Sequence, residues 1–334
     1  MNGIKKNHNM KYTHPLMQNN IDQDDLDILI KYLKKPKSRL TQGQNVAKFE
    51  KLWSKWLGVK YSVFVNSGSS ANLLSLTCLK IQNGIGEIIV SPLNWVSDIS
   101  SIIQNNFKPV FVDIDPKTMC IDTNEVIKKI NKNTKGVLLS HIQGFNGLNE
   151  KLLNVLNKNN IPLIEDVCES HGARFKNRKL GSFGKISNFS FYYAHHMSTI
   201  EGGMICTNDK KTYLILRMLR AHGLLRESND KNFIANNIKN NVNLNKDFIF
   251  MYPAYNVRNT ELNAVIGINQ LKKLDKNIKI RNQNHNLFLN NLNREIYFTD
   301  FDLVGSSNYA FNLILRKPNK KLFTKIKSIL DKNK

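Results

Sequence analysis

The stretch VFVNSGSSANLL, residues 63–74, decides the fold class. It begins with Val-Phe-Val, an apolar and β-branched run that is typical of a buried strand. Gly68 then permits a tight turn, and Ser69 and the residues after it can open a helix. A strand, a turn and a helix in succession are the building unit of an α/β sheet. The unpaired N–H groups at the start of such a helix can hold a phosphate, although a serine there also serves simply as a cap.

The same alternation of short apolar runs and longer helical patterns continues along the chain. The expected strands are 62–66, 87–91, 109–113, 136–140, 162–165, 188–193 and 203–207. The expected helices are 70–80, 124–130, 149–157, 209–220 and 261–274. Alternating strands and helices predict a mostly parallel sheet that is covered on both faces. The Asn- and Lys-rich segment 229–246 is expected to be a surface loop or insertion.

Composition limits the class of protein. The chain has 334 residues, of which 41% are hydrophobic, and this is ordinary for a globular protein of more than one unit. No apolar run reaches the roughly 18 residues that a bilayer span needs, and the N-terminal segment lacks the apolar stretch of a secretory signal. We therefore expect a cytoplasmic protein without a membrane partner.

Charge and cysteine spacing further limit the partners and cofactors that we expect. The net charge is +23, but Lys and Asn are spread along the chain without interleaved aromatic residues. We therefore expect no nucleic-acid partner, whereas a basic surface favours a substrate that carries phosphates. The cysteines, at 78, 120, 168 and 206, have no metal-site spacing, so buried free thiols are expected and neither a metal site nor an iron–sulfur cluster.

Three further motifs place chemically useful side chains after predicted strands, where ligands bind to such sheets. In SPLNWVSD, Trp95 is either a core residue or a ring that stacks on a planar cofactor. In IPLIEDVCESHGA, the carboxylate that ends the strand can bind a metal, act as a base or pair with a protonated ring nitrogen. The last fits best, because no other ligands have metal spacing. In FSFYYAHHMSTIEGGM, Ser190 can contact a phosphate and His195 follows the strand directly.

In combination and in this order, these motifs resemble the DegT-like nucleotide-sugar aminotransferases. RLTQGQNVAKFEKLWSKWLGVKYSVFVNSGSSANLL and PAYNVRNTELNAVIG support the resemblance, which runs from about Asp24 to Leu315. It implies the fold of PLP-dependent transferases, which is aspartate aminotransferase-like (fold type I). A large domain, 1–250, would contain a mixed, mostly parallel sheet and bind the cofactor. A small C-terminal α+β domain, 251–334, is expected to be incomplete, because the resembled enzymes continue beyond KIKSILDKNK.

The resemblance also implies roles for residues around pyridoxal 5'-phosphate or pyridoxamine 5'-phosphate. Asp166 would hold the pyridine nitrogen protonated, Trp95 would stack on the ring and Glu169 would lie near the ring hydroxyl. The expected phosphate contacts are Gly68, Ser69 and Ser190, with Asn256 from the neighbouring subunit of a homodimer. The expected substrate contacts are Ser38, Arg39, Leu40, Thr41, His222 and Arg226. For His222 and Arg226, a solvated basic loop is an equally good interpretation.

His195 stands where most of these enzymes have a lysine, six residues before Glu201. The spacing selects His195 over His196. An imidazole forms no stable Schiff base with the cofactor, and its reference pKa of about 6.5 suits proton transfer near neutrality. The substitution resembles the 3-dehydratase branch and implies dehydration of a 4-keto-6-deoxy nucleotide sugar, with GDP-4-keto-6-deoxy-D-mannose as the expected substrate and glutamate as amino donor. The alternatives are an aminotransferase-like activity, a CDP-4-keto-6-deoxyglucose 3-dehydrase with an iron–sulfur cluster, and an inactive cofactor-binding relative.

Overall fold

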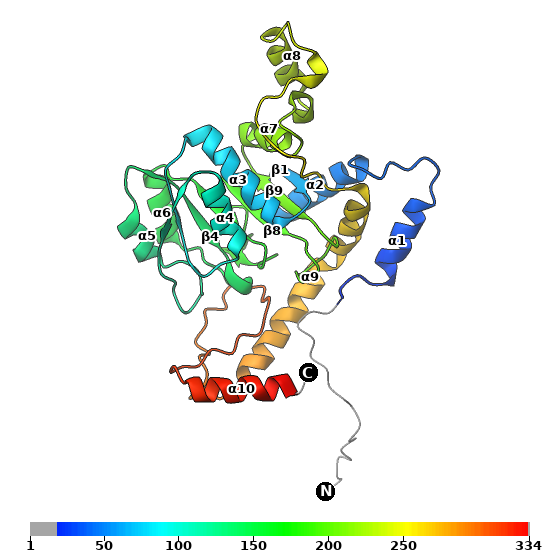
Figure 1. Cartoon of the computed structure of the whole chain (residues 1–334). Coiled ribbons are helices and arrows are strands. Elements are labelled where there is room, and N and C mark those ends of the chain that lie inside the picture. Colours follow the sequence, from blue (N-terminus) through cyan, green and yellow to red (C-terminus); the bar gives the residue numbers. More distant parts are fainter. Residues whose placement is uncertain (1–18, 333–334) are drawn as a thin grey trace.

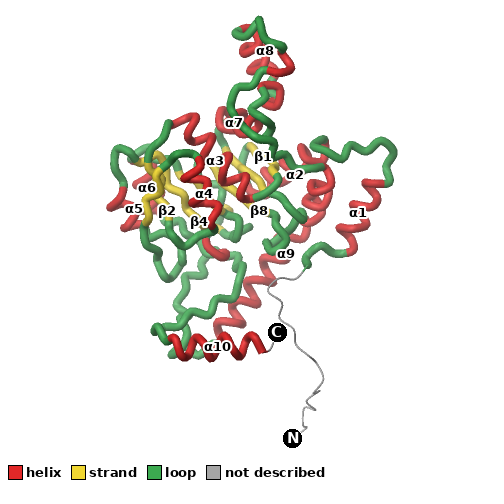
Figure 2. The backbone as a smooth tube through the Cα atoms, viewed as in Figure 1, coloured by secondary structure: helices red, strands yellow, loops and turns green. Residues whose placement is uncertain are grey.

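The computed structural model describes residues 19–332, and its centre is one mixed sheet (Figures 1 and 2). Seven strands lie in the order β1-β9-β8-β5-β4-β2-β3. They are β1 (Tyr61–Val65), β2 (Glu87–Val90), β3 (Lys108–Phe111), β4 (Thr134–Ser140), β5 (Leu163–Asp166), β8 (Ile186–Ser190) and β9 (Gly203–Thr207). Neighbours from β8 to β3 pair in parallel, whereas β9 runs antiparallel to both β1 and β8. The prediction of a mostly parallel α/β sheet is confirmed.

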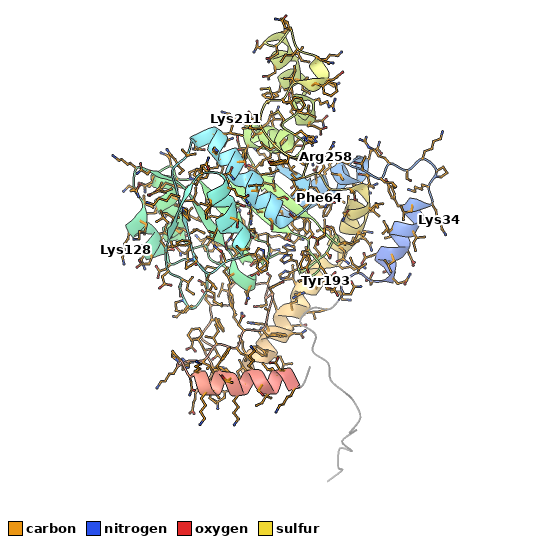
Figure 3. All side chains as sticks on the ribbon, viewed as in Figure 1. Lys34, Phe64, Lys128, Tyr193, Lys211 and Arg258 are labelled. Atoms are coloured by element: carbon orange, nitrogen blue, oxygen red, sulfur yellow. The ribbon has the colours of Figure 1, made fainter. Side chains whose placement is uncertain are left out.

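Helices cover both faces of the sheet because its strands are apolar on both sides. One face carries α3 (Gly68–Asn83), α4 (Val96–Gln104) and α7 (Lys210–Leu219), and the other carries α2 (Gln44–Leu57), α5 (Thr123–Lys129), α6 (Glu150–Lys158) and α9 (Glu261–Asn290). In β1, Val63 and Val65 pack with α3 and α7, whereas Phe64 turns to the opposite face. The ring centroid of Phe64 lies 5.0 Å from that of Phe49 in α2, and Figure 3 shows Phe64 inside the layered part. This alternation within one strand is the period-two pattern of a buried strand.

Helix α9 connects the outer helices to the sheet. Helix α1 (Gln23–Leu33) docks on it through the buried Asp25, whose carboxylate accepts hydrogen bonds from Asn269 (2.8 Å) and Gln270 (2.6 Å). At the start of α9, the Glu261 carboxylate accepts backbone hydrogen bonds from Gly43 and Val46 and so caps α2. Carboxylates thus fix both α1 and the start of α2 to α9.

The segment 229–246 is not the loop that its composition predicts. Its residues form α8 (Lys231–Lys239), between the 3-10 turns η2 (Leu225–Ser228) and η3 (Lys246–Phe248). The Asp230 side chain caps this helix by accepting from the Phe233 N–H at 2.9 Å, and the segment contains neither Gly nor Pro. None of the helix residues is buried, and α8 projects from the body of the protein (Figure 1).

The C-terminal part follows α9 away from the sheet (Figure 1). Residues 291–319 contain one isolated bridge, Tyr297 to Leu315, and α10 (Lys320–Lys332) comes after them. The division into domains at 250/251 stays a prediction, as does the cytoplasmic location. Within residues 19–332, no helix has the length and apolarity that crossing a bilayer requires.

Basic residues occur on several sides of the protein. Figure 3 shows Lys34 after α1, Lys128 in α5 and Lys211 in α7 at widely separated places. Helix α10 carries a local group of lysines, with Lys320, Lys321 and Lys325 lining one surface hollow.

Candidate active site

One cavity of about 420 Å³ lies at the carboxyl-terminal edge of the sheet, after β1, β5 and β8. It collects residues from the four motifs that place side chains after predicted strands. The predicted residues that line it are Gly68, Ser69, Trp95, Asp166, Glu169, Ser190 and His195. The lining residues that the prediction did not include are Ser67, Ser97, Cys168, Tyr192, Ala194, Glu201 and Tyr309.

The start of α3 forms one end of the cavity. Ser67 is the N-cap, and its hydroxyl accepts a hydrogen bond from the Ser70 N–H at 3.0 Å. The N–H groups of Gly68 and Ser69 occupy the first two helical positions, which have no acceptor inside a helix. A Cβ atom at Gly68 would lie 2.6 Å from the Ser190 Cβ, so only glycine allows this close approach. The result is a cradle of donors, with the positive end of the helix dipole behind it.

Asp166 lies at the end of β5 and is 7% exposed. Its Oδ1 accepts from the Cys168 N–H at 2.8 Å, and its Oδ2 accepts from the Asn72 amide at 2.9 Å. No Lys or Arg of residues 19–332 forms an ion pair with it. Its charge is therefore available to a cationic group of a ligand. Trp95, the N-cap residue of α4, is 69% exposed and forms a wall of the same cavity.

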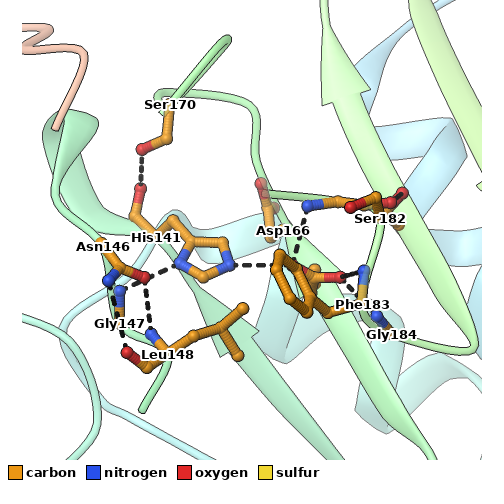
Figure 4. Close-up of polar contacts among 12 residues, drawn as sticks. His141, Asn146, Gly147, Leu148, Asp166, Ser170, Ser182, Phe183 and Gly184 are labelled. Carbon is orange, nitrogen blue, oxygen red and sulfur yellow. Dashed lines mark hydrogen bonds and ion pairs between the residues drawn. The ribbon is translucent and has the colours of Figure 1, made fainter. Parts of the chain in front are cut away.

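Glu165, the neighbour of Asp166 in β5, stabilises a turn of the fold instead. Its carboxylate accepts backbone hydrogen bonds of 2.5 to 3.0 Å from the turn at 181–184. It also lies 3.3 Å from the His141 Nε2. Figure 4 shows His141 between the Asn146–Leu148 loop and this strand end. Of the two adjacent carboxylates, only Asp166 lines the cavity, because successive residues of a strand point to opposite faces.

His195 is held by a loop that closes on itself after β8. The Phe191 N–H donates to the Gly202 carbonyl (2.8 Å), and the His195 N–H donates to the Tyr192 carbonyl (3.0 Å). The imidazole centroid lies 5.5 Å from that of Tyr309, and the buried Nδ1 has no hydrogen-bond partner among residues 19–332. Burial lowers the pKa of His195 to about 4, with Arg281 lowering it further and Asp166 opposing the shift. This pKa lies well below the reference value on which the sequence argument relied.

His196 turns away from this cavity. Its Nε2 lies 3.2 Å from the Ser307 carbonyl oxygen, and it lines a separate cavity beside α9. The ring is 1% exposed, and burial holds its pKa well below the usual range. The structure therefore brings His195, and not its neighbour, to the residues around Asp166.

The remaining predicted residues lie outside this cavity within one chain. The segment Ser38 to Thr41 connects α1 to α2, and the Leu40 carbonyl accepts from the Glu261 N–H at 3.2 Å. His222 lines another surface cavity with residues 250–254. Asn256 is exposed, and its side chain accepts from the backbone and side chain of Arg258. The exposed Arg226 donates to the Asp247 carbonyl oxygen at 3.0 Å.

Several residues near the site escaped the sequence analysis. Tyr309 and Arg281 come from distant parts of the chain. The segment SSNYAFNLIL, which contains Tyr309, is similar to the resembled enzymes, but no role for Tyr309 follows from that likeness. Asn72 and Asp98 are buried polar residues on the packed faces of α3 and α4, and polar positions within apolar helical stretches were the available signal. Within the described part of the chain, no group of three His, Cys, Asp or Glu is arranged to hold a metal ion. The expectation of buried free thiols is confirmed for Cys78, Cys120 and Cys206, whereas Cys168 is partly exposed.

A sheet of this order, with a helix N-terminus, a buried carboxylate and an aromatic wall at its edge, defines the aspartate aminotransferase-like class of fold type I. The chain belongs to the DegT/DnrJ/EryC1/StrS aminotransferase family, whose family model matches residues 19–332.

Three relatives show where in the family the similarity is high. A GDP-4-keto-6-deoxy-D-mannose 3-dehydratase of Escherichia coli O55:H7 is 36% identical over 284 residues, which are 83% of this chain and 73% of that protein. The structure of an E. coli GDP-4-keto-6-deoxy-D-mannose-3-dehydratase with bound hydrated PLP superposes with a TM-score of 0.87 at 32% identity, covering 95% of this chain and 83% of that one. A GDP-4-keto-6-deoxymannose-3-dehydratase with a trapped PLP-glutamate geminal diamine gives a TM-score of 0.84 at 31% identity, with 95% and 84% covered.

Proposed function

We propose that this protein is a pyridoxal-phosphate-dependent 3-dehydratase of a 4-keto-6-deoxy nucleotide sugar. GDP-4-keto-6-deoxy-D-mannose is the proposed substrate, and glutamate is the proposed amino donor. One observation carries the proposal: His195 lines the cavity near Asp166, and no lysine from residues 19–332 lines it. The names of the similar dehydratases, one solved with hydrated PLP and one with a PLP-glutamate adduct, support the choice of substrate and donor.

The cavity residues fit the cofactor at both of its ends. Gly68, Ser69 and Ser190 would form the cradle that holds the phosphate. Glycine is needed at position 68 because a Cβ atom there would lie 2.6 Å from the Ser190 Cβ. At the other end, Asp166 would hold the ring nitrogen, Trp95 would cover the ring and Glu169 would lie near its hydroxyl. When bound, the cofactor supplies an amine for the 4-keto group and a conjugated ring that accepts electrons.

Asp166 would keep the ring nitrogen protonated. Its carboxylate is buried, accepts two hydrogen bonds and forms no ion pair with a Lys or Arg of residues 19–332, so its oxygens remain available to the ring nitrogen. In a site of low dielectric constant, such a charge favours a bound cation strongly. The same burial excludes water from this end of the site.

His195 would move the proton. With a pKa of about 4 the imidazole is neutral at pH 7, which is the form that removes a proton. The protonated ring is then a strong acid and would return the proton to the departing 3-hydroxyl. Because phosphate groups of cofactor and substrate bring negative charge to the cavity, we expect the pKa of His195 to rise when they bind.

A homodimer would complete the site. His222, Arg226 and Asn256 are exposed in the single chain and do not reach its own cavity. We propose that they act in the cavity of the neighbouring subunit, where a basic side chain suits the diphosphate of the substrate. The active site of each subunit would then be incomplete without the other subunit.

The products distinguish this proposal from its rivals. Purified protein is incubated with pyridoxal phosphate, glutamate and GDP-4-keto-6-deoxy-D-mannose, and ammonia, 2-oxoglutarate and the sugar are measured. Dehydration releases ammonia and 2-oxoglutarate in equal amounts and leaves a 3-deoxy-4-keto sugar. An aminotransferase gives 2-oxoglutarate and a 4-amino sugar without ammonia, and an inactive relative gives neither; both results would overturn the proposal.

The variant His195→Lys tests the base directly. We expect it to acquire a covalently linked cofactor, visible as a change in absorbance, and to lose ammonia release. His195→Asn should bind the cofactor and lose turnover, whereas Asp113→Asn, an exposed change outside the cavity, should retain both. Ammonia release by His195→Asn at the wild-type rate would show that another residue moves the proton.

A further inference from the structure

Asp98 lies behind the cavity in the first turn of α4 and is 1% exposed. Its Oδ1 accepts a hydrogen bond from the Asn72 amide at 2.6 Å, and its Oδ2 accepts from the Ser140 hydroxyl at 2.5 Å. The same Asn72 nitrogen donates to Asp166 at 2.9 Å. An amide nitrogen has two hydrogens, so Asn72 can serve both carboxyl groups at once. Three elements, α3, α4 and β5, therefore meet in one polar cluster.

This cluster has more carboxyl groups than compensating charges. No Lys or Arg of residues 19–332 forms an ion pair with Asp98 or Asp166. Burial, followed by the charge of Asp166, raises the pKa of Asp98 well above its usual range, and Glu169 adds to the effect while the Ser140 hydroxyl opposes it. Two buried like charges that share the Asn72 amide would repel each other strongly, and one proton removes the repulsion.

We propose that Asp98 is a positioning residue that works as a neutral acid. Together with Asn72 it fixes the Asp166 carboxylate and leaves Asp166 as the ionised group of the pair, facing the cavity. The inference rests on the proposed function, because the charge of Asp166 matters only if the ring nitrogen of the cofactor binds there.

A protonated Asp98 suits its surroundings better than an apolar side chain or an ionised carboxylate would. Its carbonyl oxygen accepts from Asn72, and its hydroxyl can form the 2.5 Å hydrogen bond with the Ser140 hydroxyl in either direction. An apolar side chain would remove the acceptor that lies 2.6 Å from the Asn72 nitrogen and leave the buried Ser140 hydroxyl without its partner, so Asn72 would hold Asp166 less firmly. An ionised Asp98 would instead place a second negative charge behind the site.

The protonation state can be measured without the cofactor. Infrared difference spectra of the cofactor-free protein at pH 7 compare the wild type with Asp98→Asn and Asp113→Asn, which remove one carboxyl group each. We expect a band of a protonated carboxylic acid in the wild type and in Asp113→Asn, and its loss in Asp98→Asn. If the wild type lacks this band at pH 7, Asp98 is ionised and the inference is overturned.

Cofactor binding tests the positioning role. Because Asn keeps the shape and the neutrality of the acid, Asp98→Asn should bind pyridoxal phosphate within about threefold of the wild type. Asp98→Ala should bind it about tenfold or more weakly, because Asn72 and Ser140 lose their acceptor. The nitrogen-15 shift of labelled pyridoxal phosphate should report a protonated ring in the wild type and in Asp98→Asn, and urea unfolding confirms that each variant is folded.

The two proposals fail in different ways. If the wild type does not bind pyridoxal phosphate, the proposed function is wrong, and the infrared band still decides the state of Asp98. If the wild type binds and Asp98→Asn weakens binding by about tenfold or more, Asp98 contributes charge and not neutral positioning. Equal binding by the wild type and Asp98→Ala would show that Asp98 has no positioning role.

Discussion

Because the pKa of His195 is low in the folded protein, we expect protonation of this side chain to make the free energy of unfolding depend on pH. Its pKa is about 4 in the folded protein, against about 6.5 in an unfolded chain. As pH falls, the unfolded state therefore binds the proton first. The stabilising contribution is fully present above about pH 6.5 and is lost as pH falls towards 4. The difference in pKa corresponds to about 3 kcal/mol at most, and the opening of the cavity to solvent reduces it.

The assay compares the wild type with His195→Asn. Free energies of unfolding from urea titrations between pH 4 and 8 are subtracted, so that the other titrating groups cancel. We expect the wild type to lose as much as about 3 kcal/mol relative to the variant between pH 6.5 and 4. Added inorganic phosphate should make this loss smaller, because an anion at the start of α3 favours the imidazolium and raises the pKa of His195 in the folded protein towards its unfolded value. A flat difference, or an NMR titration of the His195 ring at or above pH 6.5, would refute the reasoning.

Two further variants test the framework of the site. Gly68→Ala should weaken pyridoxal phosphate binding about tenfold or more, because the new Cβ would lie 2.6 Å from the Ser190 Cβ. Fluorescence titration measures the affinity, with Ser70→Ala as the control. Unchanged binding by Gly68→Ala would show that the start of α3 does not hold the phosphate. Glu165→Ala should lower the free energy of unfolding by about 3 kcal/mol or more, because one buried and two partly buried N–H groups lose a common acceptor. In the same urea titrations Glu125→Ala, which removes a partly exposed carboxylate paired with Lys128, should cost less than about 1 kcal/mol. An equal loss in both variants would contradict the role of Glu165.

The strands could be predicted from the sequence because their apolar runs are short and sharply bounded. The expected strand 203–207 coincides with β9, and 62–66 differs from β1 by one residue at each end. The exception is 188–193, which ends in the structure at Ser190. Its last three residues are as apolar as a strand, but the Phe191 N–H already donates to Gly202 and the chain turns into the histidine loop. The tertiary contact, and not the local pattern, sets that boundary.

The residues of the candidate site also differ in how well the sequence predicts their positions. Asp166 and Ser190 end strands, and Gly68 and His195 follow strands. Because the carboxyl ends of parallel strands share one edge of a sheet, the order of strands and helices predicts that these residues meet. Tyr309 reaches the cavity from a segment without regular structure, and only the three-dimensional path of the chain places it there.

The charges of the cavity explain how a histidine at 195 changes the way in which a ligand is held. Asp166 has no cation from the chain beside it, and the start of α3 presents unpaired donors at the other end. A lysine at 195 would be cationic at pH 7 and would compete with the ring nitrogen for Asp166, whereas the His195 imidazole is neutral. The negative charge therefore remains free for a cationic ring, and the helix end for a phosphate. If the proposed function is right, no covalent link replaces these contacts, and the cradle and Asp166 together would hold the cofactor. Asn72, which donates to both Asp166 and Asp98, would then help to orient the Asp166 carboxylate.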